Sequence, residues 1–235
     1  MSLESYIKYE VEEKNVVMFY QKIDTKNNCD HYECLARIKN DISIPPFVFL
    51  PIIIIKLNLY EEFTKTVIEK SFKMFENKNI FFSINLSYSD FENKNIFQFL
   101  RDKLEKYDHL GKYLIIEVLE DEIKDFSVIN SFFSNLKPYG VQFAIDDFGK
   151  NYSNLTHLLY LKPDFLKIDI FLIKEININP RAKIIIKTLV SLAEKLNMKV
   201  VAEGVEDKKT YQALSEYKID GYQGFYFSKP SSELS

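Results

Sequence analysis

The stretch that decides the fold is residues 141–202, where short apolar strands alternate with helical segments. Residues 141–146 read VQFAID, residues 165–169 read FLKID and residues 199–202 read KVVA. Between the last two of these, Arg181–Leu196 places apolar residues three and four apart, which is the period of an amphipathic helix. Such alternation predicts parallel strands joined by helical crossovers.

The same alternation extends outward along the chain. Further segments carry the β-branched and aromatic residues typical of strands, which makes eight strands in all. Eight strands with crossover helices favour a closed β/α barrel over an open sheet. The expected strands are Val16–Ile23, His31–Ile38, Ile80–Leu86, Tyr113–Val118, Val141–Asp146, Phe165–Asp169, Lys199–Ala202 and Tyr222–Phe227. The expected helices include Tyr60–Glu76, Ile123–Leu136, Arg181–Leu196 and Lys208–Tyr217.

The first two strands depart from this scheme. Only Asp24–Asp30 separates them, which leaves no room for a crossover helix, so we expect an antiparallel hairpin. The fold class is therefore α/β, a (βα)8 TIM-barrel-like fold with an irregular antiparallel first strand. No repeat, linker or charge block divides residues 1–235, so we expect a single domain, compatible with a piece of a longer multidomain protein.

Composition excludes several classes of protein. The chain has 235 residues, 46% of them hydrophobic, as expected for a packed core, and its net charge of -3 provides no basic field for a long nucleic acid. The apolar run Ile42–Ile55 is shorter than the ~20 residues of a membrane span and contains prolines, so it predicts a loop and the start of a buried helix rather than a membrane contact. Two cysteines, Cys29 and Cys34, form no disulfide framework, and no secretory signal is present, so we expect a cytoplasmic location.

Polar residues lie at the ends of nearly all the predicted strands. In a β/α barrel the carboxyl ends of the strands meet at one face, so these side chains should converge. Several buried carboxylates in one place need cations to neutralise them. The residues concerned are Glu33 in the second strand, Asn85, Glu117, Asp146 and Asp147 at the next three strand ends, Lys167 in the sixth, Glu203 after the seventh and Gln223 in the eighth.

The ligands on offer are oxygens. The three histidines show no metal-ligand spacing, so the pattern favours Mg²⁺ or Mn²⁺ over zinc. Adjacent Asp146 and Asp147 could bridge or separately hold two ions, as in two-metal phosphoryl sites. Taken singly, an acid at a strand end is more often a helix cap or a solvated loop residue, and that alternative stays open for each.

Two basic residues also have two interpretations each. Arg37 shares a strand face with Glu33, where its guanidinium suits a phosphate, but it could equally form a structural salt bridge with a barrel carboxylate. Lys167 could position a phosphate or a water molecule, or could simply pair with Asp169.

Seven short motifs follow one another along nearly the whole chain. In content and order they resemble the motifs of the EAL-domain phosphodiesterases of bacterial cyclic di-GMP signalling, with Glu-Cys-Leu in place of Glu-Ala-Leu. They are Tyr32–Arg37 (YECLAR), Ile84–Ser87 (INLS), Ile116–Glu120 (IEVLE), Ala144–Gly149 with Tyr152–Ser153 (AIDDFG, YS), Leu166–Asp169 (LKID), Val201–Glu206 (VAEGVE) and Gln223–Pro230 (QGFYFSKP).

The resemblance implies hydrolysis of cyclic di-GMP to linear pGpG with two Mg²⁺ or Mn²⁺ ions. It also implies a homodimer through the loop after Asp147 and a possible upstream sensory or diguanylate cyclase module. By motif position, the metal ligands would be Glu33, Asn85, Glu117, Asp146 and Asp147. Lys167 would orient water and substrate, Glu203 would be the general base, Gln21, Leu35, Arg37 and Gln223 would lie at the substrate, and Glu120 would anchor the loop after Asp147.

Four departures from the family pattern bear on activity. Leu119 replaces a threonine beside Glu120, Lys150-Asn151 replaces a small residue and a glycine, Lys22 replaces a proline, and the connection between Ile38 and Tyr60 is short and apolar. They leave open a catalytically inactive receptor for cyclic di-GMP. A third alternative is an unrelated Mg²⁺-dependent barrel enzyme, because a fold alone does not determine function.

Overall fold

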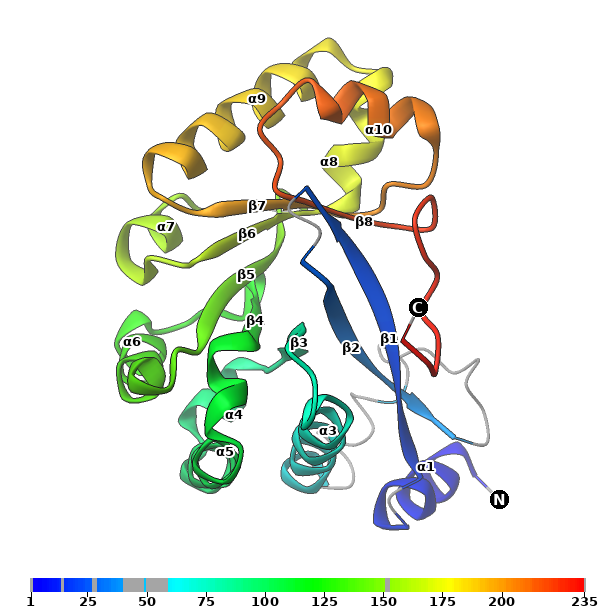
Figure 1. Cartoon of the computed structure of the whole chain (residues 1–235), viewed down its shortest axis with the longest axis vertical. Coiled ribbons are helices and arrows are strands. Elements are labelled where there is room, and N and C mark those ends of the chain that lie inside the picture. The colour runs from blue at the N-terminus through cyan, green and yellow to red at the C-terminus, as the bar shows by residue number, and fades with distance from the viewer. Residues whose placement is uncertain are drawn as a thin grey trace.

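The computed structural model describes residues 2–13, 15–26, 29–39, 49, 59–150 and 153–234. Its strands form a closed barrel in which each strand pairs with the next and β8 pairs with β1, which confirms the predicted fold class (Figure 1). The strands are β1 (Val16–Thr25), β2 (His31–Ile38), β3 (Phe81–Asn85), β4 (Leu114–Leu119), β5 (Gln142–Phe148), β6 (Phe165–Ile168), β7 (Lys199–Ala202) and β8 (Gly221–Gln223).

The irregular first strand is also confirmed. Strand β1 runs antiparallel to both β2 and β8, and Gln21 of β1 lies opposite Glu33 of β2. The pairs from β2 to β8 are parallel. The C-terminal segment returns alongside β1, where Ser231 bridges to Tyr20 (Figure 1).

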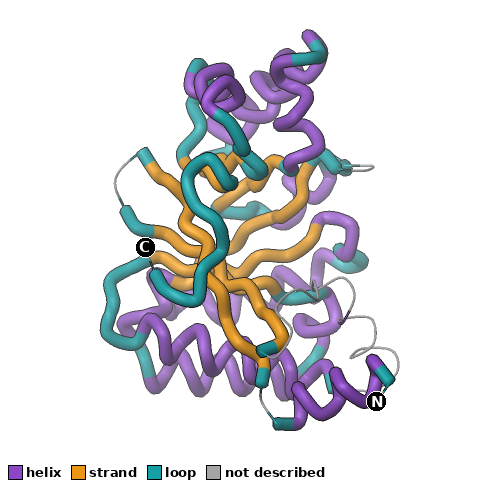
Figure 2. Tube along the Cα trace, turned by 90° about the vertical axis from the view of Figure 1, so that its right-hand side faces the viewer, coloured by secondary structure: helices purple, strands orange, loops and turns teal. Residues whose placement is uncertain are grey.

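Helices lie around the strands (Figures 1 and 2). Short polar side chains begin several of them: the Asp125 carboxylate accepts the N–H of Ser127 ahead of α6, and the Asp207 carboxylate accepts that of Thr210 in α10. The α-helices are α1 (Leu3–Glu12), α3 (Tyr60–Phe75), α4 (Tyr88–Glu92), α5 (Lys94–Lys106), α6 (Phe126–Leu136), α7 (Thr156–Leu161), α8 (Ile170–Lys174), α9 (Pro180–Lys195) and α10 (Lys208–Ser215). The 3-10 turns are η2 (Asp108–Tyr113), η3 (Glu120–Glu122), η4 (Lys137–Tyr139) and η5 (Glu175–Asn177).

Two bodies of apolar side chains hold the barrel together. The larger fills the space between strands and helices, where Phe75 and Phe82 stack with ring centroids 4.5 Å apart. The smaller consists of the buried residues Ile23, Ile115, Ala144, Phe165 and Val201. Since alternate residues of a strand share a face, these positions place the smaller cluster directly below the polar strand ends.

Two predicted elements differ from the structure by three or more residues at one end. Strand β8 ends at Gln223 rather than Phe227, because the backbone turns at Gly224, whose carbonyl accepts the N–H groups of Phe227 and Ser228. A Cβ on Gly224 would lie 2.1 Å from the carbonyl oxygen of Val205, so only glycine permits this close approach.

The helix expected from Ile123 begins instead at Phe126, after the Asp125 cap. The predictions for Ile42–Ile55 lie outside the described residues except at Phe49, which is buried. In the described part of the chain, no helix is both long enough and apolar enough to span a bilayer.

Candidate active site at the strand ends

A single buried lysine lies among carboxylates contributed by four strands. Lys167 of β6 is 1% exposed. Its Nζ lies 2.6 Å from Glu117 Oε2 and 2.8 Å from Glu203 Oε1. The same Nζ lies 3.0 Å from Asp146 Oδ1 and 3.5 Å from Glu33 Oε2. The predicted convergence of polar strand ends is therefore present, and the alternative in which Lys167 pairs with Asp169 is wrong, since the Asp169 carboxylate caps α8 through the N–H of Phe171.

The carboxylates form two triads that share one residue. Oxygens of Glu33, Glu117 and Asp146 lie within 4.8 Å of one another, and so do oxygens of Asp146, Asp147 and Glu203. Asp146 belongs to both groups and is buried. This arrangement offers two adjacent places for hard cations, since carboxylate oxygens are the ligands that Mg²⁺ and Mn²⁺ prefer.

Amide side chains extend the cluster toward β1. Asn85 Nδ2 donates to Glu33 Oε1 at 2.7 Å, and Gln223 Nε2 donates to Glu33 Oε2 at 2.6 Å. Gln223 Nε2 also lies 3.2 Å from Gln21 Oε1, and Gln21 Nε2 donates to the carbonyl of Ser228 at 3.1 Å. Both oxygens of Glu33 are thus held in place by amides, one on β3 and one on β8.

The electrostatics of the cluster favour further positive charge. Burial raises the pKa of Glu117, Asp146 and Glu203, and neighbouring carboxylates raise it further. Glu33 behaves differently: burial opposes its ionisation, but Lys167 and the two amides bring its pKa below the usual value. The four carboxylates raise the pKa of Lys167 well above 10.5 despite its burial. The single ammonium of Lys167 does not balance the four carboxylates around it, so the donor set fits divalent ions.

The loop after β5 is held at both of its ends. Asp147 has a left-handed backbone with φ of 56°, and its N–H donates to Asp146 Oδ1 at 2.9 Å. Lys150 Nζ donates to Asp147 Oδ2 at 2.5 Å. Beyond the loop, Ser153 Oγ donates to Glu120 Oε2 at 2.6 Å, and Asn154 N–H donates to Glu120 Oε1 at 2.7 Å. Glu120 therefore contacts the loop as expected of an anchor, although Leu119 replaces a threonine.

The two other residues expected to contact substrate, Leu35 and Arg37, lie beyond Glu33 toward the carboxyl end of β2. Arg37 is half-buried and its Nη1 donates to the carbonyl of Ala36 at 2.8 Å. Within the residues that the structure describes, Arg37 forms no ion pair with a barrel carboxylate. Leu35 lines a largely apolar cavity of ≈ 260 Å³ together with Asn85 and Leu119, so this cavity adjoins the polar cluster.

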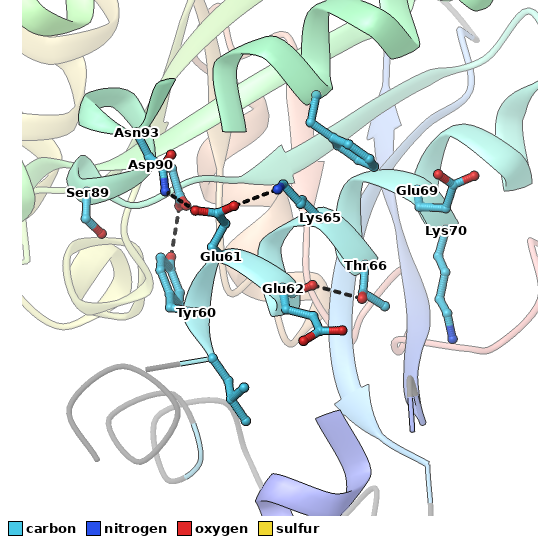
Figure 3. Close-up of a pocket in the computed structure, with 12 residues that line it drawn as sticks. Tyr60, Glu61, Glu62, Lys65, Thr66, Glu69, Lys70, Ser89, Asp90 and Asn93 are labelled. Carbon is cyan, nitrogen blue, oxygen red and sulfur yellow. Dashed lines mark hydrogen bonds and ion pairs between the residues drawn. The ribbon is translucent and has the colours of Figure 1, made fainter. Parts of the chain in front are cut away.

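A larger hollow of ≈ 840 Å³ lies elsewhere, over α3 on the outside of the barrel (Figure 3). Its polar groups bond to one another: the Tyr60 hydroxyl donates to Asp90 at 2.9 Å, and Lys65 donates to Glu61 at 2.6 Å. None of the predicted site residues lines it. The chemistry therefore belongs to the strand ends.

Sequence reasoning missed several supporting residues. His157 Nδ1 lies 3.3 Å from Glu120 Oε1, and the Ser153 hydroxyl accepts the N–H of Gly149 at 2.6 Å. Ser228 holds Gln21 through its carbonyl. Ser153 and Ser228 each belong to a recognised motif, which was the available signal. His157 lies outside those motifs and had no such signal.

Comparisons with known proteins agree with this geometry. A family model described as EAL domain matches residues 5–230. Cyclic di-GMP phosphodiesterase PdeA of Borreliella burgdorferi is 34% identical over 234 residues, which cover 96% of this chain and 35% of that protein. Probable cyclic di-GMP phosphodiesterase PdeA of Escherichia coli is 30% identical over 95% of this chain and 32% of that protein.

The fold has close counterparts among solved structures. The PaMucR phosphodiesterase, solved as a c-di-GMP complex, superposes with a TM-score of 0.88 and 27% identity, covering 98% of each chain. The chain spans about a third of the length of the two curated relatives, so the likeness covers one part of those proteins.

Proposed function

Because this chain belongs to the EAL domain family, as its motifs predict, we propose that it hydrolyses cyclic di-GMP to linear pGpG. Residues 1–235 form a single EAL domain in this proposal. The observation that carries it is the pair of carboxylate triads that share Asp146. Two adjacent cation sites at strand ends suit a phosphodiester, because its negative charge increases around the phosphorus during in-line attack.

The proposed metal ligands are Glu33, Asn85, Glu117, Asp146 and Asp147. Two Mg²⁺ or Mn²⁺ ions bound there would neutralise the phosphate and make water more acidic. The protein's own contribution is to hold these ligands in place. The amides of Asn85 and Gln223 fix Glu33, and the N–H of Asp147 fixes Asp146.

Glu203 is the proposed general base. Its carboxylate lies 2.8 Å from Lys167 Nζ, and burial raises its pKa, which makes it a stronger acceptor for the proton of an attacking water. Lys167 touches the same carboxylates that surround this position and would orient both the water and the phosphate.

The substrate contacts extend from this cluster along β2. Arg37 would pair with a phosphate, since it has a guanidinium without a carboxylate partner among the described residues. Leu35 would contact a guanine in the apolar cavity that it lines, and Gln21 and Gln223 would lie at the opposite side of the phosphate.

A second candidate function is a receptor that binds cyclic di-GMP without cleaving it. One observation favours it: Lys150 holds the Asp147 carboxylate at 2.5 Å, so a cation must compete with an ammonium for this ligand. The Leu119 side chain beside the loop anchor is 36% exposed. A protein with a weakened second cation site would bind the dinucleotide and fail to hydrolyse it.

We also propose a homodimer through the loop after Asp147, and a cytoplasmic location. Just beyond that loop, α7 and its N-terminal flank expose Leu155, Leu159 and Tyr160, which are 57%, 66% and 54% accessible. Adjacent exposed apolar residues of this kind are typical of an interface. Both cysteines are free and Cys29 is exposed, which suits a reducing compartment.

Chromatography of the products formed with Mn²⁺ tests the proposal. We expect pGpG from the wild-type protein and a ~10²–10⁴-fold slower reaction from Glu203→Gln. Glu206→Gln, which changes an exposed glutamate three residues on, is the matched control and should match the wild type. Binding of cyclic di-GMP without pGpG would identify the receptor, whereas no binding at all would refute both candidates.

A further inference from the structure

A third cavity lies at the opposite end of the barrel from the carboxylates. Its volume is ≈ 190 Å³. Five of its lining residues are the first residues of their strands. Strands β2 and β7 contribute side chains to both ends of the barrel, and on β2 the residues His31 and Glu33 share one face. The five are His31, Phe81, Phe165, Lys199 and Gly221.

The walls of this cavity are aromatic. The His31 ring lies 6.4 Å from the Phe81 ring and 6.2 Å from the Phe165 ring, measured between centroids. At Gly221 the chain packs closely, because a Cβ there would come within 3.0 Å of Ile23 and 3.4 Å of Val201. A cavity of about 150 Å³ already accommodates benzene, so this one accommodates a substituted six-membered ring.

A buried polar atom in the wall has no partner. His31 is 5% exposed, and nothing among the described residues forms a hydrogen bond with its Nε2. Leaving such an atom unsatisfied is energetically unfavourable. An imidazole nitrogen donates or accepts according to its tautomer, and a hydroxyl can do either, so a ligand hydroxyl satisfies Nε2 in both cases.

The rim of the cavity carries a positive charge. Lys199 is exposed, and its Nζ lies 5.1 Å from the centroid of the Phe165 ring. In the part of the chain that the structure describes, no carboxylate pairs with Lys199. Asp220 also lines the cavity, but its Oδ2 accepts the backbone N–H of Val200 at 2.8 Å, which directs that carboxylate toward the chain. The rim thus favours an anionic group beside Lys199.

We propose that this cavity binds a small aromatic carboxylate that carries a ring hydroxyl. The ring packs against His31, Phe81 and Phe165, the hydroxyl reaches His31 Nε2, and the carboxylate lies at Lys199. This site is separate from the strand-end carboxylates and does not depend on turnover of cyclic di-GMP.

Titration of the full chain with four probes, followed by protein NMR, tests the proposal. The probes are 4-hydroxybenzoate, benzoate, phenol and cyclohexanecarboxylate. We expect 4-hydroxybenzoate to bind about fivefold more tightly than benzoate, because it adds one hydrogen bond of about 1 kcal/mol. Phenol, which lacks the carboxylate, and cyclohexanecarboxylate, which lacks the aromatic ring, should bind more weakly than either.

Two variants assign the contacts. His31→Phe keeps an aromatic ring and should remove the advantage of 4-hydroxybenzoate over benzoate, while Lys199→Gln should weaken both. Lys187→Gln, an exposed lysine on α9, is the control for charge and should change neither. Equal affinity of all four probes, or binding that neither variant alters, would overturn the proposal.

A measurement on the wild-type protein keeps the test valid if a variant does not fold. Cys29 lines the same cavity and is exposed, whereas Cys34 is buried, so one thiol should react with a disulfide reagent. Bound 4-hydroxybenzoate should slow the reaction of Cys29 several-fold, and cyclohexanecarboxylate at the same concentration should slow it less. An unchanged rate at saturating 4-hydroxybenzoate would count against the site.

Discussion

The same strands carry buried charged side chains at one end of the barrel and mainly aromatic side chains at the other. At the carboxyl end, Glu33 and Glu203 face each other across Lys167, and charge is concentrated in a buried space. At the amino end, two residues earlier on β2 and four residues earlier on β7, His31 and Lys199 border an aromatic cavity with little charge. The direction of a strand decides where charge is concentrated, since the catalytic side chains of β/α barrels lie at the carboxyl ends of the strands.

The difference also concerns energy. The amino end is stabilised mainly by aromatic packing within the chain. The carboxyl end is electrostatically incomplete, because burial and mutual repulsion raise the pKa of Glu117 and Asp146. Substitutions at the carboxyl end should therefore have large effects on hydrolysis and stability that depend on metal. Substitutions at the amino end should have small effects that do not depend on metal.

The largest effect is expected from Asp146→Asn. This residue belongs to both carboxylate triads, so the change impairs both cation sites. Loss of several kcal/mol of transition-state stabilisation corresponds to about 10³-fold slower hydrolysis. Product chromatography at saturating Mn²⁺ measures it, with Lys199→Gln at the amino end as the control of unchanged rate. Hydrolysis by Asp146→Asn within tenfold of the wild type would show that the shared carboxylate is not needed for catalysis.

Lys167→Met should produce the next largest effect, on stability. The methionine fills a similar volume but removes the ammonium that pairs with Glu117 and Glu203. Removing one partner of a buried ion pair costs about 3–5 kcal/mol. Urea unfolding without metal measures the loss, and Lys199→Met, at an exposed lysine, should cost far less. Equal losses of unfolding free energy from the two variants would show that the ammonium of Lys167 does not stabilise the carboxylate cluster.

Metal and pH should have coupled effects on the free energy of unfolding, through the carboxylates at the carboxyl end of the barrel. Because the pKa of Glu117 is raised above 4.5 in the folded state, the folded chain holds a proton that the unfolded chain releases. Metal-free stability should therefore fall as pH rises above 4.5. Metal ligands must be deprotonated, so stabilisation by Mn²⁺ should grow from pH 6 to pH 8, reaching about 2.7 kcal/mol when free Mn²⁺ is 100-fold above its Kd.

Unfolding by urea at the two pH values, with and without Mn²⁺, measures this coupling. Asp146→Asn should remove most of the difference, because it removes the ligand that both triads share. Stabilisation by Mn²⁺ that is the same at pH 6 and pH 8 would show that the raised pKa values do not govern metal binding.

The smallest effect at this end is expected from Lys150→Ala. The change releases Asp147 from an ammonium whose side chain is 50% exposed. Since partly exposed ion pairs contribute about 0–1 kcal/mol, Mn²⁺ affinity should rise by up to about fivefold. Calorimetric titration measures it, with Lys187→Ala as the control. Weaker Mn²⁺ binding by Lys150→Ala would mean that Lys150 supports the site instead of competing for it.

The barrel and its polar rim follow from local patterns. Runs such as VQFAID predict a strand and place Asp146 at its end, so the rim could be predicted without the structure. Which groups Lys167 pairs with could not be predicted, because the local pattern places Lys167 at the rim without showing that four carboxylates surround its ammonium. The turn at Gly224 also escaped prediction, since Phe225–Phe227 carry strand-like side chains and the reason for the turn is contact with distant Val205.

The amino-end cavity escaped prediction for a related reason. His31, Phe81 and Phe165 look like ordinary core residues at strand starts. Only their arrangement around a space of ≈ 190 Å³, with His31 Nε2 left without a partner among the described residues, distinguishes them from a filled core. Sequence patterns predict which face a side chain occupies, but not the volume that remains after packing.

The most direct test of the central claim is an anomalous difference map from crystals grown with Mn²⁺. We expect two peaks at the strand ends, one among Glu33, Glu117 and Asp146, and one among Asp146, Asp147 and Glu203. A map with no peak at this end of the barrel, at a Mn²⁺ concentration that supports hydrolysis, would contradict the claim.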